Sequence, residues 1–511
     1  MPVQYSIAHF CMPACMVLAL CVQPVPAGEW HSKFIKLNSN GSLTYMPDAK
    51  GNIIPDFSRV GYYHGNRPIP VIPVVRTVQA TDTNDYTIRI QAAIDEVSKR
   101  APGADGFRGA VLLKKGVYRV NAPLQIQASG VVLRGEGNTK NGTVLIATDT
   151  NHNALVQVAG NGSVKAVAAS RTSITDSYVP TGAFSFRVAD ASRFKPGDNI
   201  IIHYHFNDKW IQDIRMNQIV AREGTQQWKA GSFDLSFERT ISKVEGNSIT
   251  TDNPVVMAID AQYGNAEVYS YSFEGRLQQV GIENLYCESI YAGDEDEAHS
   301  WDAIYINKVE NGWVKAVTAR YFSYACVNLD NQAKNITVLD GYCFDAKSLV
   351  TGGRRYSFCN NGQQNLFINC NTTEGRHDFV TGARVCGPNV FVNCSAKQTH
   401  ADIGPHHRWS AGTLYDNIVT DGEINVQDRG NWGSGHGWAG VTQVLWHCSV
   451  KQAAVQSPWA SGKNYCIGLK GGKYGGRFAD RPDAEWEGQN KEGLQPSSLY
   501  YAQLKARNNQ Q

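Results

Sequence analysis

The chain has 511 residues, more than one compact core normally holds, so we expect several domains or a single repeat architecture. Its formal net charge is +2 and only 18 % of its residues are charged, which argues against a nucleic-acid-wrapping protein, a coiled coil and a disordered chain. Glycine (48), tyrosine (23) and tryptophan (11) are abundant instead, as in turn-rich β proteins with aromatic binding surfaces. We therefore expect neither a nucleic-acid partner nor, beyond the first few dozen residues, an apolar run of the roughly 18 residues that span a membrane.

Residues 1–27 are predicted to be a signal peptide that sends the protein to the periplasm or the extracellular space. An apolar stretch, MVLALCV, precedes Val25-Pro26-Ala27, where small residues suit a signal peptidase. The segment lacks the basic residues that usually open such peptides, so a mis-assigned start or a short anchor is the alternative. Without it nine cysteines remain, all from Cys287 onward and with no CxxC pair, which favours buried free thiols over a disulfide framework.

The next segments are predicted in chain order as a leader, a helix and strands. Residues 28–80 are rich in Pro, Gly and Tyr and indicate an irregular leader. A helical apolar pattern follows within 81–100, with Asp85 as the candidate N-cap and the stripe at Ile88, Ala92, Ile94 and Val97. The segments GAVLLKKGVYRV and SGVVLRGEG then indicate short strands interrupted by glycine.

This series resembles the opening of pectin-lyase-like proteins. The resemblance runs from Asp85 to Gly137, through DYTIRIQAAID and the two glycine-punctuated strand segments. It implies a right-handed parallel β-helix whose open end is covered by the short helix. It does not specify a reaction, because lyases, hydrolases and phage tailspikes share this opening.

The rest of the chain divides into an insertion, a repeat and a tail. Residues 160–265 include an alternating apolar pattern and a Pro-Gly-Asp turn, which predict a small inserted β subdomain between the first coils at 81–159 and the main β-helix at 266–472. Residues 473–511 are predicted to form a tail that includes a short helix at LYYAQLKAR. The predicted fold class is thus all-β, a solenoid with a capping helix and one insertion.

The main repeat shows its own period. Asn365 and Asn389 are 24 residues apart, and so are Cys370 and Cys394. In a parallel stack one coil lifts equivalent side chains by about 4.8 Å. We therefore expect Cys370 and Cys394 to lie over each other and face inward.

The period also aligns four segments that begin with an apolar residue and end in arginine five positions on. They are LVTGGR (349–354), FVTGAR (379–384), IGPHHR (403–408) and INVQDR (424–429). Four arginines are thus predicted to form one outward-facing column, Arg354, Arg384, Arg408 and Arg429. Stacked guanidinium groups repel one another, so a bound polyanion would stabilise them, since guanidinium matches carboxylate or sulfate in a bidentate way. The alternative is a structural ladder in which each arginine pairs with a neighbouring acid.

Ionisable and aromatic residues gather around this column. Residues 400–408 hold three of the 13 histidines, whose imidazoles can take up or release protons near neutral pH. The same alignment stacks Asp378 on Asp402 and Arg376 on His400. The catalytic candidates are His400, Asp402, His406, His407, Arg408 and Tyr415. The substrate-binding candidates are Arg354, Arg376, Asp378, Arg384, Trp409, Arg429, His436 and Trp438.

No metal site is assigned from the sequence. The acidic run from Asp294 to Glu297 could bind calcium, although a solvated loop is the more common role of such a run. A zinc site in the histidine-rich segment lacks an HExxH motif or a spaced cysteine partner. Calcium is therefore the one cofactor kept as an option.

The predicted function is cleavage of a uronic-acid-containing polysaccharide by β-elimination. This reaction needs a group that neutralises the uronate carboxylate, a base for the proton at C5 and an acid for the leaving oxygen. The arginine column is assigned the first role, His406 or His407 the second, and His400 or Tyr415 the third. The resemblance implies an arginine or lysine base with calcium in related families, but their motifs are not recognisable here. The prediction depends on all four guanidinium groups pointing outward from one face.

Two other functions stay open at this point. A glycoside hydrolase would use two carboxylates, for which Asp378 and Asp402 are the first choice, joined by Glu374, Asp416 or Glu423. A non-catalytic, glycan-binding β-helix would use the arginines only to hold its ligand.

Overall fold

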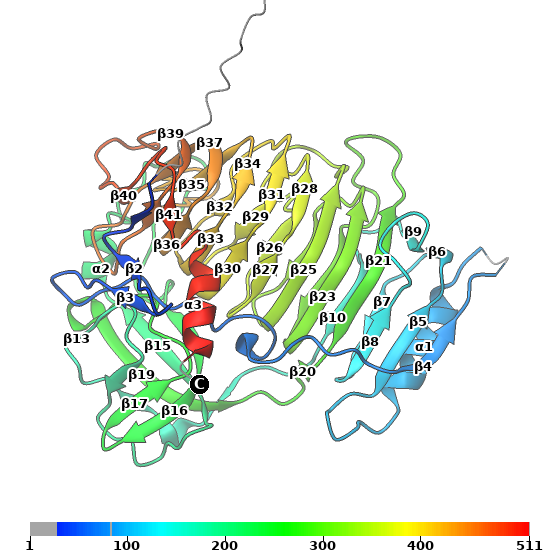
Figure 1. Ribbon diagram of the computed structural model, residues 1–511, viewed down its shortest axis with the longest axis horizontal. Helices are drawn as coiled ribbons and strands as arrows, with labels where there is room; N and C mark the ends of the chain where they lie inside the picture. Colours follow the sequence, from blue (N-terminus) through cyan, green and yellow to red (C-terminus); the bar gives the residue numbers. More distant parts are fainter. Residues whose placement is uncertain (1–27, 82–83, 510–511) are drawn as a thin grey trace, which may run out of the picture.

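The computed structural model describes residues 28–81 and 84–509, so the predicted signal peptide lies outside the described residues. The main body is a right-handed parallel β-helix, as predicted (Figure 1). One side of the coils is a parallel sheet made of β7 (Leu124–Ile126), β10 (Ala154–Ala159), β22 (Asp302–Asn307), β24 (Ala325–Leu329), β26 (Phe358–Asn360), β29 (Phe379–Thr381) and β32 (Gly404–Pro405). No helix in the described ranges is long and apolar enough to cross a membrane.

The other two sides of the coils belong to one continuous 21-stranded sheet. Its strands are β4 (Val74–Val78), β5 (Gly109–Leu113), β6 (Gly116–Val120), β8 (Val131–Arg134), β9 (Thr143–Ala147), β20 (Leu277–Gln278), β21 (Gly281–Ser289), β23 (Val309–Arg320), β25 (Lys334–Phe344), β27 (Leu366–Ile368), β28 (Asn371–Thr373), β30 (Cys386–Val392), β31 (Ser395–Lys397), β33 (Ser410–Asp416), β34 (Val419–Thr420), β35 (Glu423–Val426), β36 (Gly440–Trp446), β37 (Ser449–Val455), β38 (Tyr465–Ile467), β39 (Lys470–Lys473) and β40 (Glu485–Glu487). Because β40 pairs with β38, the β-helix continues past the predicted limit at residue 472.

Each later coil bends at a single residue with left-handed backbone geometry. Asn369 and Asn393 have φ of +55° and +54°, and their neighbours pair in register, so the two bends stack. Asparagine tolerates this conformation better than most residues. Cysteine follows directly, so Cys370 lies opposite Cys394 in the interior, as predicted.

All nine cysteines of the described chain are buried and free. The sequence-based expectation of packed thiols is therefore confirmed. Burial raises the pKa of Cys448 to about 12, which keeps this thiol protonated at neutral pH.

The helix α1 (Thr87–Ser98) covers the open end of the first coils. The side chain of Asp85 accepts a hydrogen bond from the backbone N–H of Thr87 at its start. The predicted apolar stripe is wrong at Ile88, which is 82 % exposed, and at Ala92, which is also exposed. The buried face instead follows the complete i, i+3, i+4, i+7 set formed by Ile90, Ala93, Ile94 and Val97.

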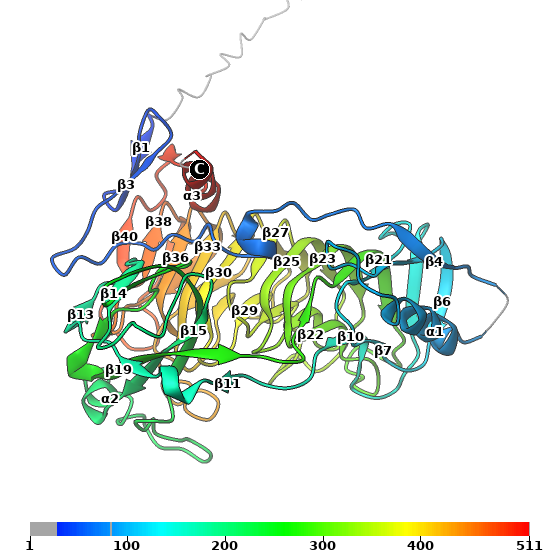
Figure 2. The same cartoon turned by 90° about the horizontal axis from the view of Figure 1, so that it is seen from below.

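The leader and the tail lie together at the C-terminal end of the β-helix (Figure 2). Strand β1 (Trp30–His31) pairs with β41 (Leu494–Gln495), and β2 (Ile35–Leu37) pairs with β3 (Leu43–Tyr45). The predicted tail helix is α3 (Leu499–Asn508), where Gln503 accepts a hydrogen bond from the backbone N–H of Phe57. The leader then runs back along the coils to β4 in the first coil (Figure 1).

The predicted insertion is an antiparallel β subdomain packed against the late coils (Figure 1). It extends beyond the predicted limit at residue 265, because its central strand β19 continues to Ser272. Its elements are β11 (Lys165–Ala166), β12 (Thr172–Ser173), β13 (Tyr178–Val179), β14 (Ser185–Arg187), β15 (Asn199–Phe206), α2 (Asp208–Asp213), β16 (Leu235–Glu245), β17 (Ser248–Thr251), β18 (Ile259–Asp260) and β19 (Gly264–Ser272).

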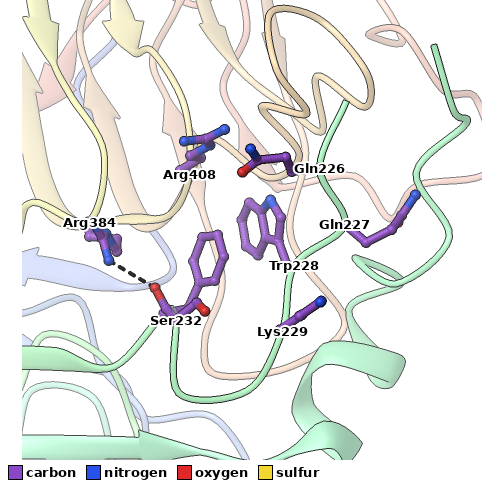
Figure 3. Close-up of a pocket in the computed structure, with 8 residues that line it drawn as sticks. Gln226, Gln227, Trp228, Lys229, Ser232, Arg384 and Arg408 are labelled. Atoms are coloured by element: carbon purple, nitrogen blue, oxygen red, sulfur yellow. Dashed lines mark hydrogen bonds between the residues drawn. The ribbon is translucent and has the colours of Figure 1, made fainter. Parts of the chain in front are cut away.

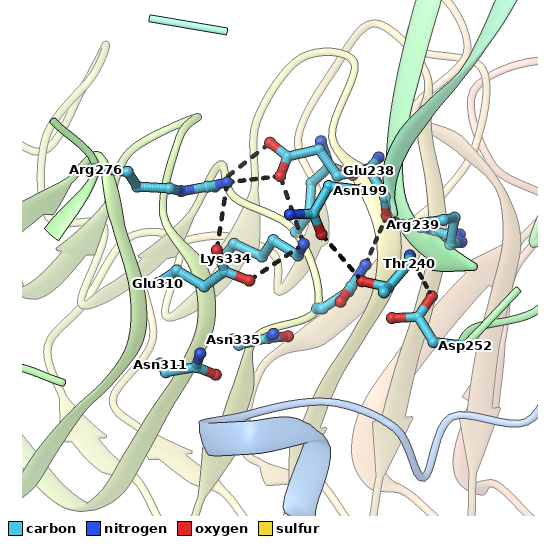
Figure 4. A network of polar contacts seen from close by, with 12 residues as sticks. Asn199, Glu238, Arg239, Thr240, Asp252, Arg276, Glu310, Asn311, Lys334 and Asn335 are labelled. Atoms are coloured by element: carbon cyan, nitrogen blue, oxygen red, sulfur yellow. Dashed lines mark hydrogen bonds and ion pairs between the residues drawn. The ribbon is translucent and has the colours of Figure 1, made fainter. Parts of the chain in front are cut away.

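A buried ion network joins this subdomain to the middle coils (Figure 4). Glu238 of β16 accepts a hydrogen bond of 2.6 Å from Arg276, and Lys334 lies 3.3 Å from Glu310 and 3.6 Å from Glu238. Burial alone would raise the pKa of Glu238, but the two cations outweigh it and lower the pKa to about 2. The network therefore stays charged and links β16 of the subdomain to β23 and β25 of the coils.

Candidate active site

A cavity of 620 Å³ opens beside the last strands of the seven-stranded sheet. Four of its lining side chains are imidazoles, those of His377, His406, His407 and His436, and we call it the histidine cavity. It includes three of the predicted histidines. It also brings in His377, which the sequence analysis did not select.

The strand ladder explains why these residues meet. Val380 of β29 pairs with Gly404 of β32, so the residues just before and after the two strands are stacked as well. His377 precedes β29, and its Nδ1 lies 2.7 Å from the carbonyl oxygen of Asp402, which precedes β32. His406 follows β32 and donates its backbone N–H to Thr381 of β29 at 2.8 Å. His436 comes from the loop 430–437 that follows β35.

The four imidazoles form a compact cluster. The ring centroid of His406 lies 4.4 Å from that of His377 and 5.1 Å from those of His407 and His436. Burial, followed by the charges of their neighbours, lowers the pKa of His407 to about 3 and that of His436 to about 4. Burial also lowers the pKa of His406 far below its ordinary range. The imidazoles are therefore neutral at pH 7, and each keeps one unprotonated ring nitrogen.

A buried ion pair supports the floor of the cavity. Arg429 is 2 % exposed, and its guanidinium donates to both carboxylate oxygens of Asp402. Burial alone would raise the pKa of Asp402, but Arg429 outweighs it and the pKa falls below its usual value. Asp402 is thus an anion whose charge is already matched.

Three further side chains line the histidine cavity. Burial raises the pKa of Tyr356 to about 12, so its phenol keeps its proton at neutral pH. Its ring centroid is 5.5 Å from that of His406. Trp432 is 40 % exposed and offers an aromatic surface, and Arg376 donates to the carbonyl oxygen of Gly352.

A second cavity, of 460 Å³, lies between the late coils and the inserted subdomain (Figure 3). Arg384 and Arg408 enter it from the β-helix, and Trp228, Lys229 and Phe233 enter it from the subdomain, so we call it the arginine cavity. The backbone N–H of Arg384 donates to the carbonyl of Arg408 at 2.8 Å, which confirms that these two arginines belong to adjacent coils. No carboxylate lines this cavity within the described ranges, which makes it suited to an anionic ligand.

One loop separates the two cavities. Ser434 of the loop 430–437 lines the histidine cavity and accepts a hydrogen bond of 2.6 Å from Arg408 of the arginine cavity. The subdomain holds this loop from the other side, where Arg222 donates to the carbonyl of Gly433 at 2.7 Å. A ligand that crosses Ser434 would therefore touch both cavities.

The predicted column of four arginines is wrong. Arg354 lies in the loop before β26 and pairs with Glu297 at 2.9 Å, because Phe358 rather than Leu349 is the strand partner of Phe379. Arg429 is in the expected coil, but it turns inward to Asp402. For both arginines the structural alternative of pairing with an acid is correct. The sequence-based argument for an acidic ligand, which required all four guanidinium groups on one face, therefore fails, and only Arg384 and Arg408 keep the predicted arrangement.

Several predicted contact residues do not reach either cavity. Trp409 and Trp438 are fully buried and pack against the subdomain, since the indole N–H of Trp438 donates to the carbonyl of Ile214 at 2.9 Å. Tyr415 is fully buried in the coil interior, where it stacks on Phe391, so it cannot act as the acid. His400 is exposed and lines neither cavity, although the next residues of its loop, Ala401 and Asp402, line the histidine cavity.

The predicted carboxylate pair is also separated. Asp378 stands beside Asp402 in register, but it points into the coil and accepts hydrogen bonds of 2.8 Å from Ser357 and Thr372. It is fully buried, and burial raises its pKa to about 6. Asp402 alone faces the histidine cavity.

The acidic run considered for calcium has protein partners of its own. Asp294 lies 2.7 Å from Lys347, Asp296 accepts two backbone N–H groups, and Glu297 binds Arg354. In the described chain these carboxylates are not among the groups whose atoms lie close enough to hold a metal ion together. Calcium binding there stays a prediction.

Site residues of two kinds escaped the sequence analysis: those of the coils, which are His377 and Tyr356, and those of the insertion. His377 could have been found by the period, because it stands one coil below Ala401, next to Asp402. Trp228, Lys229 and Phe233 could not, because the insertion shares no repeat with the coils that it packs against.

Comparisons with known proteins do not identify the function of this chain. No protein-family model and no curated protein matches the chain. Among solved structures, the ORF18 protein of Geobacillus virus E2 is 14 % identical over 81 % of this chain (TM-score 0.36), and this chain spans 59 % of its length. The tailspike protein gp49 from Pseudomonas phage LKA1 is 13 % identical, with 78 % and 73 % of the two chains covered (TM-score 0.33). An exopolygalacturonase from Thermotoga maritima is 11 % identical, with 79 % and 82 % covered (TM-score 0.35). At this level of similarity, function has to be derived from the site.

Proposed function

We propose that the protein is a lyase that cleaves a uronic-acid-containing polysaccharide by β-elimination at the histidine cavity. The observation that carries this proposal is the position of Ser434, which lines the histidine cavity and accepts a hydrogen bond from Arg408 of the arginine cavity. Two cavities of different chemistry therefore adjoin at this residue. One holds neutral imidazoles and a protonated phenol, and the other holds two guanidinium groups without a lining carboxylate. Together they offer the three groups that elimination from a uronate requires.

In the proposed reaction the uronate carboxylate faces Arg408 and Arg384. His406 or His407 takes the proton from C5, and the electron pair left behind forms the double bond between C4 and C5. The bond from C4 to the bridging oxygen breaks, and Tyr356 gives its proton to that oxygen. Water then reprotonates the phenolate and accepts the proton of the imidazolium, which restores both groups.

The low pKa values of the histidine cluster are consistent with such a role. After burial, positive neighbours such as Arg429 and Arg408 contribute to lowering the pKa of His407. A bound uronate carboxylate brings the opposite charge, so it would raise the pKa of the imidazole toward the range of an effective base. The base would then gain strength when substrate is present.

A hydrolase with paired carboxylates is less well supported. Asp402 is the one carboxylate that lines the histidine cavity within the described residues, and it is neutralised by Arg429. Asp378, its predicted partner, faces the coil interior. A glycan-binding protein without turnover would use the arginine cavity in the same way, and only an assay separates it from a lyase.

The test is incubation of the full-length protein with polymers of different uronic acids. A lyase produces new reducing ends and equal numbers of unsaturated uronate ends, which absorb in the ultraviolet. Reducing ends without that absorbance would show a hydrolase, and neither product together with retention on the immobilised polymer would show a binding protein. Both of these outcomes contradict the proposal.

A further inference from the structure

We propose that the inserted subdomain binds one divalent transition-metal ion of the zinc type through His203, His205 and Asp234. Within the described chain these three residues form the one group of potential ligands whose histidine nitrogens and carboxylate oxygen all lie within 4.8 Å of one another. None of them lines the histidine or the arginine cavity. The inference therefore does not depend on the proposed function.

The antiparallel sheet brings the three residues to one face. His203 and His205 are two residues apart on β15, so their side chains point to the same side of the sheet. Strand β16 pairs with β15 so that Ser236 is opposite His203 and Leu235 is opposite Tyr204. Asp234, the residue before β16, is thereby placed beside His205.

The ligand atoms converge on one point. Asp234 Oδ2 lies 3.0 Å from His205 Nδ1 and 3.7 Å from His203 Nε2. With metal–ligand bonds of about 2.0–2.1 Å, two ligand atoms of a tetrahedral zinc site are about 3.3 Å apart. These two separations lie on either side of that value, and the ligand nitrogens of the two histidines lie within 4.8 Å of each other, so small side-chain rotations would bring all three atoms to one ion.

Each ligand is also held by its other polar atom. His203 Nδ1 lies 2.8 Å from the hydroxyl of Ser236, and His205 Nε2 lies 3.1 Å from the carboxylate of Glu267 on β19. Asp234 Oδ1 accepts the backbone N–H of Phe206 at 3.1 Å. Metal-binding histidines commonly have such a partner on the second ring nitrogen, which fixes the tautomer and the orientation of the ring.

The donor set indicates the type of metal. Two imidazoles and one carboxylate suit zinc and similar ions, whereas calcium and magnesium prefer oxygen ligands. The His205 side chain is 46 % exposed, so water can complete the coordination. A bound ion would link β15 to the start of β16, and through Glu267 to β19.

The experiment uses untagged, full-length protein that has been freed of metal. Calorimetric titration with zinc chloride should show one ion per chain, cobalt chloride should give the visible absorption of a tetrahedral site, and zinc should raise the melting temperature. We expect His203→Ala and Asp234→Asn to lose binding, and Ser236→Ala to bind about 10–100-fold more weakly. His152→Ala, at an exposed histidine of the β-helix, is the matched control and should bind as wild type.

Two results would overturn this inference. One is the absence of saturable zinc binding by the wild-type protein. The other is unchanged stoichiometry and affinity in His203→Ala, which would place the ion elsewhere, such as in the histidine cavity. Melting curves of the metal-free variants show whether they fold, and His205→Gln, at the most exposed of the three ligands, repeats the test with a milder change.

Discussion

The histidine cavity and the arginine cavity lie on opposite sides of Ser434, but they are built in different ways. The first is made from loops of successive coils and contains groups whose charge depends on their surroundings. The second is completed by the insertion and contains arginines, whose charge is fixed. From this difference we expect a division of labour: proton transfer takes place in the histidine cavity, and the arginine cavity holds the anionic chain.

The largest expected effect is at the base. We expect His407→Ala or His406→Ala to lower kcat by about 10²–10⁴-fold, because a general base contributes that much to proton transfer. The rate of unsaturated-end formation on the uronate polymer measures it.

The matched control is again His152→Ala, which should keep the wild-type rate. Melting curves must accompany both histidine variants of the cavity. If the rates of both fall only in proportion to the folded fraction, the two histidines are structural and the division of labour is wrong.

The second-largest expected effect is on the free energy of unfolding and concerns the buried ion pair beside the histidine cavity. Asp402→Asn leaves the buried guanidinium of Arg429 without a matching charge, and breaking a buried pair in this way costs about 3–5 kcal/mol. We expect a clear fall in the midpoint of urea unfolding. Arg384→Ala should lower the free energy of unfolding far less, because the Arg384 side chain is exposed and has a single carbonyl partner at 2.8 Å. Equal losses in the two variants would contradict the structural contrast.

The arginine cavity should affect binding more than chemistry. We expect Arg384→Ala and Arg408→Ala to raise KM by about tenfold each, which corresponds to about 1.4 kcal/mol of lost contact with an anionic sugar. Because each arginine also helps to neutralise the uronate carboxylate during proton abstraction, kcat should fall as well, but less than in the histidine variants. Steady-state kinetics at several salt concentrations measure this, and the variants should depend less on salt than the wild type. A large fall in kcat with unchanged KM would show that these arginines act in the transition state alone and do not retain the chain.

The sequence predicted the coil register better than the direction of side chains. The 24-residue period correctly stacked Cys370 on Cys394 and placed Arg384 next to Arg408. It failed at Arg354 because the coil from β26 to β29 advances 21 residues rather than 30. It failed differently at Arg429, whose position is right but whose side chain turns inward toward Asp402.

Contacts between the insertion and the coils could not be predicted at all. The sequence predicts that Trp409 and Trp438 bind substrate, because they stand beside histidines and arginines. Their indoles are instead covered by the subdomain, a neighbour that no coil period describes. Periodicity therefore predicts what one coil places over the next, and it is silent on what packs against the outside.

The smallest expected effect is a pH dependence of stability that comes from the histidine cavity and not from the arginine cavity. Burial lowers the pKa of His377 from its ordinary 6.5 to about 4 in the folded protein. As the pH falls below about 6.5, the unfolded chain takes up a proton at this histidine and the folded chain does not, so stability decreases until about pH 4. Between about pH 7 and about pH 5.5 this one group should account for a loss on the order of 1 kcal/mol. The difference between the urea midpoints at the two pH values should therefore be smaller in His377→Gln than in wild type. Arg384→Ala should leave the pH dependence unchanged, because its charge does not titrate there. Equal acid sensitivity in wild type and His377→Gln would show that this imidazole is not held neutral by burial.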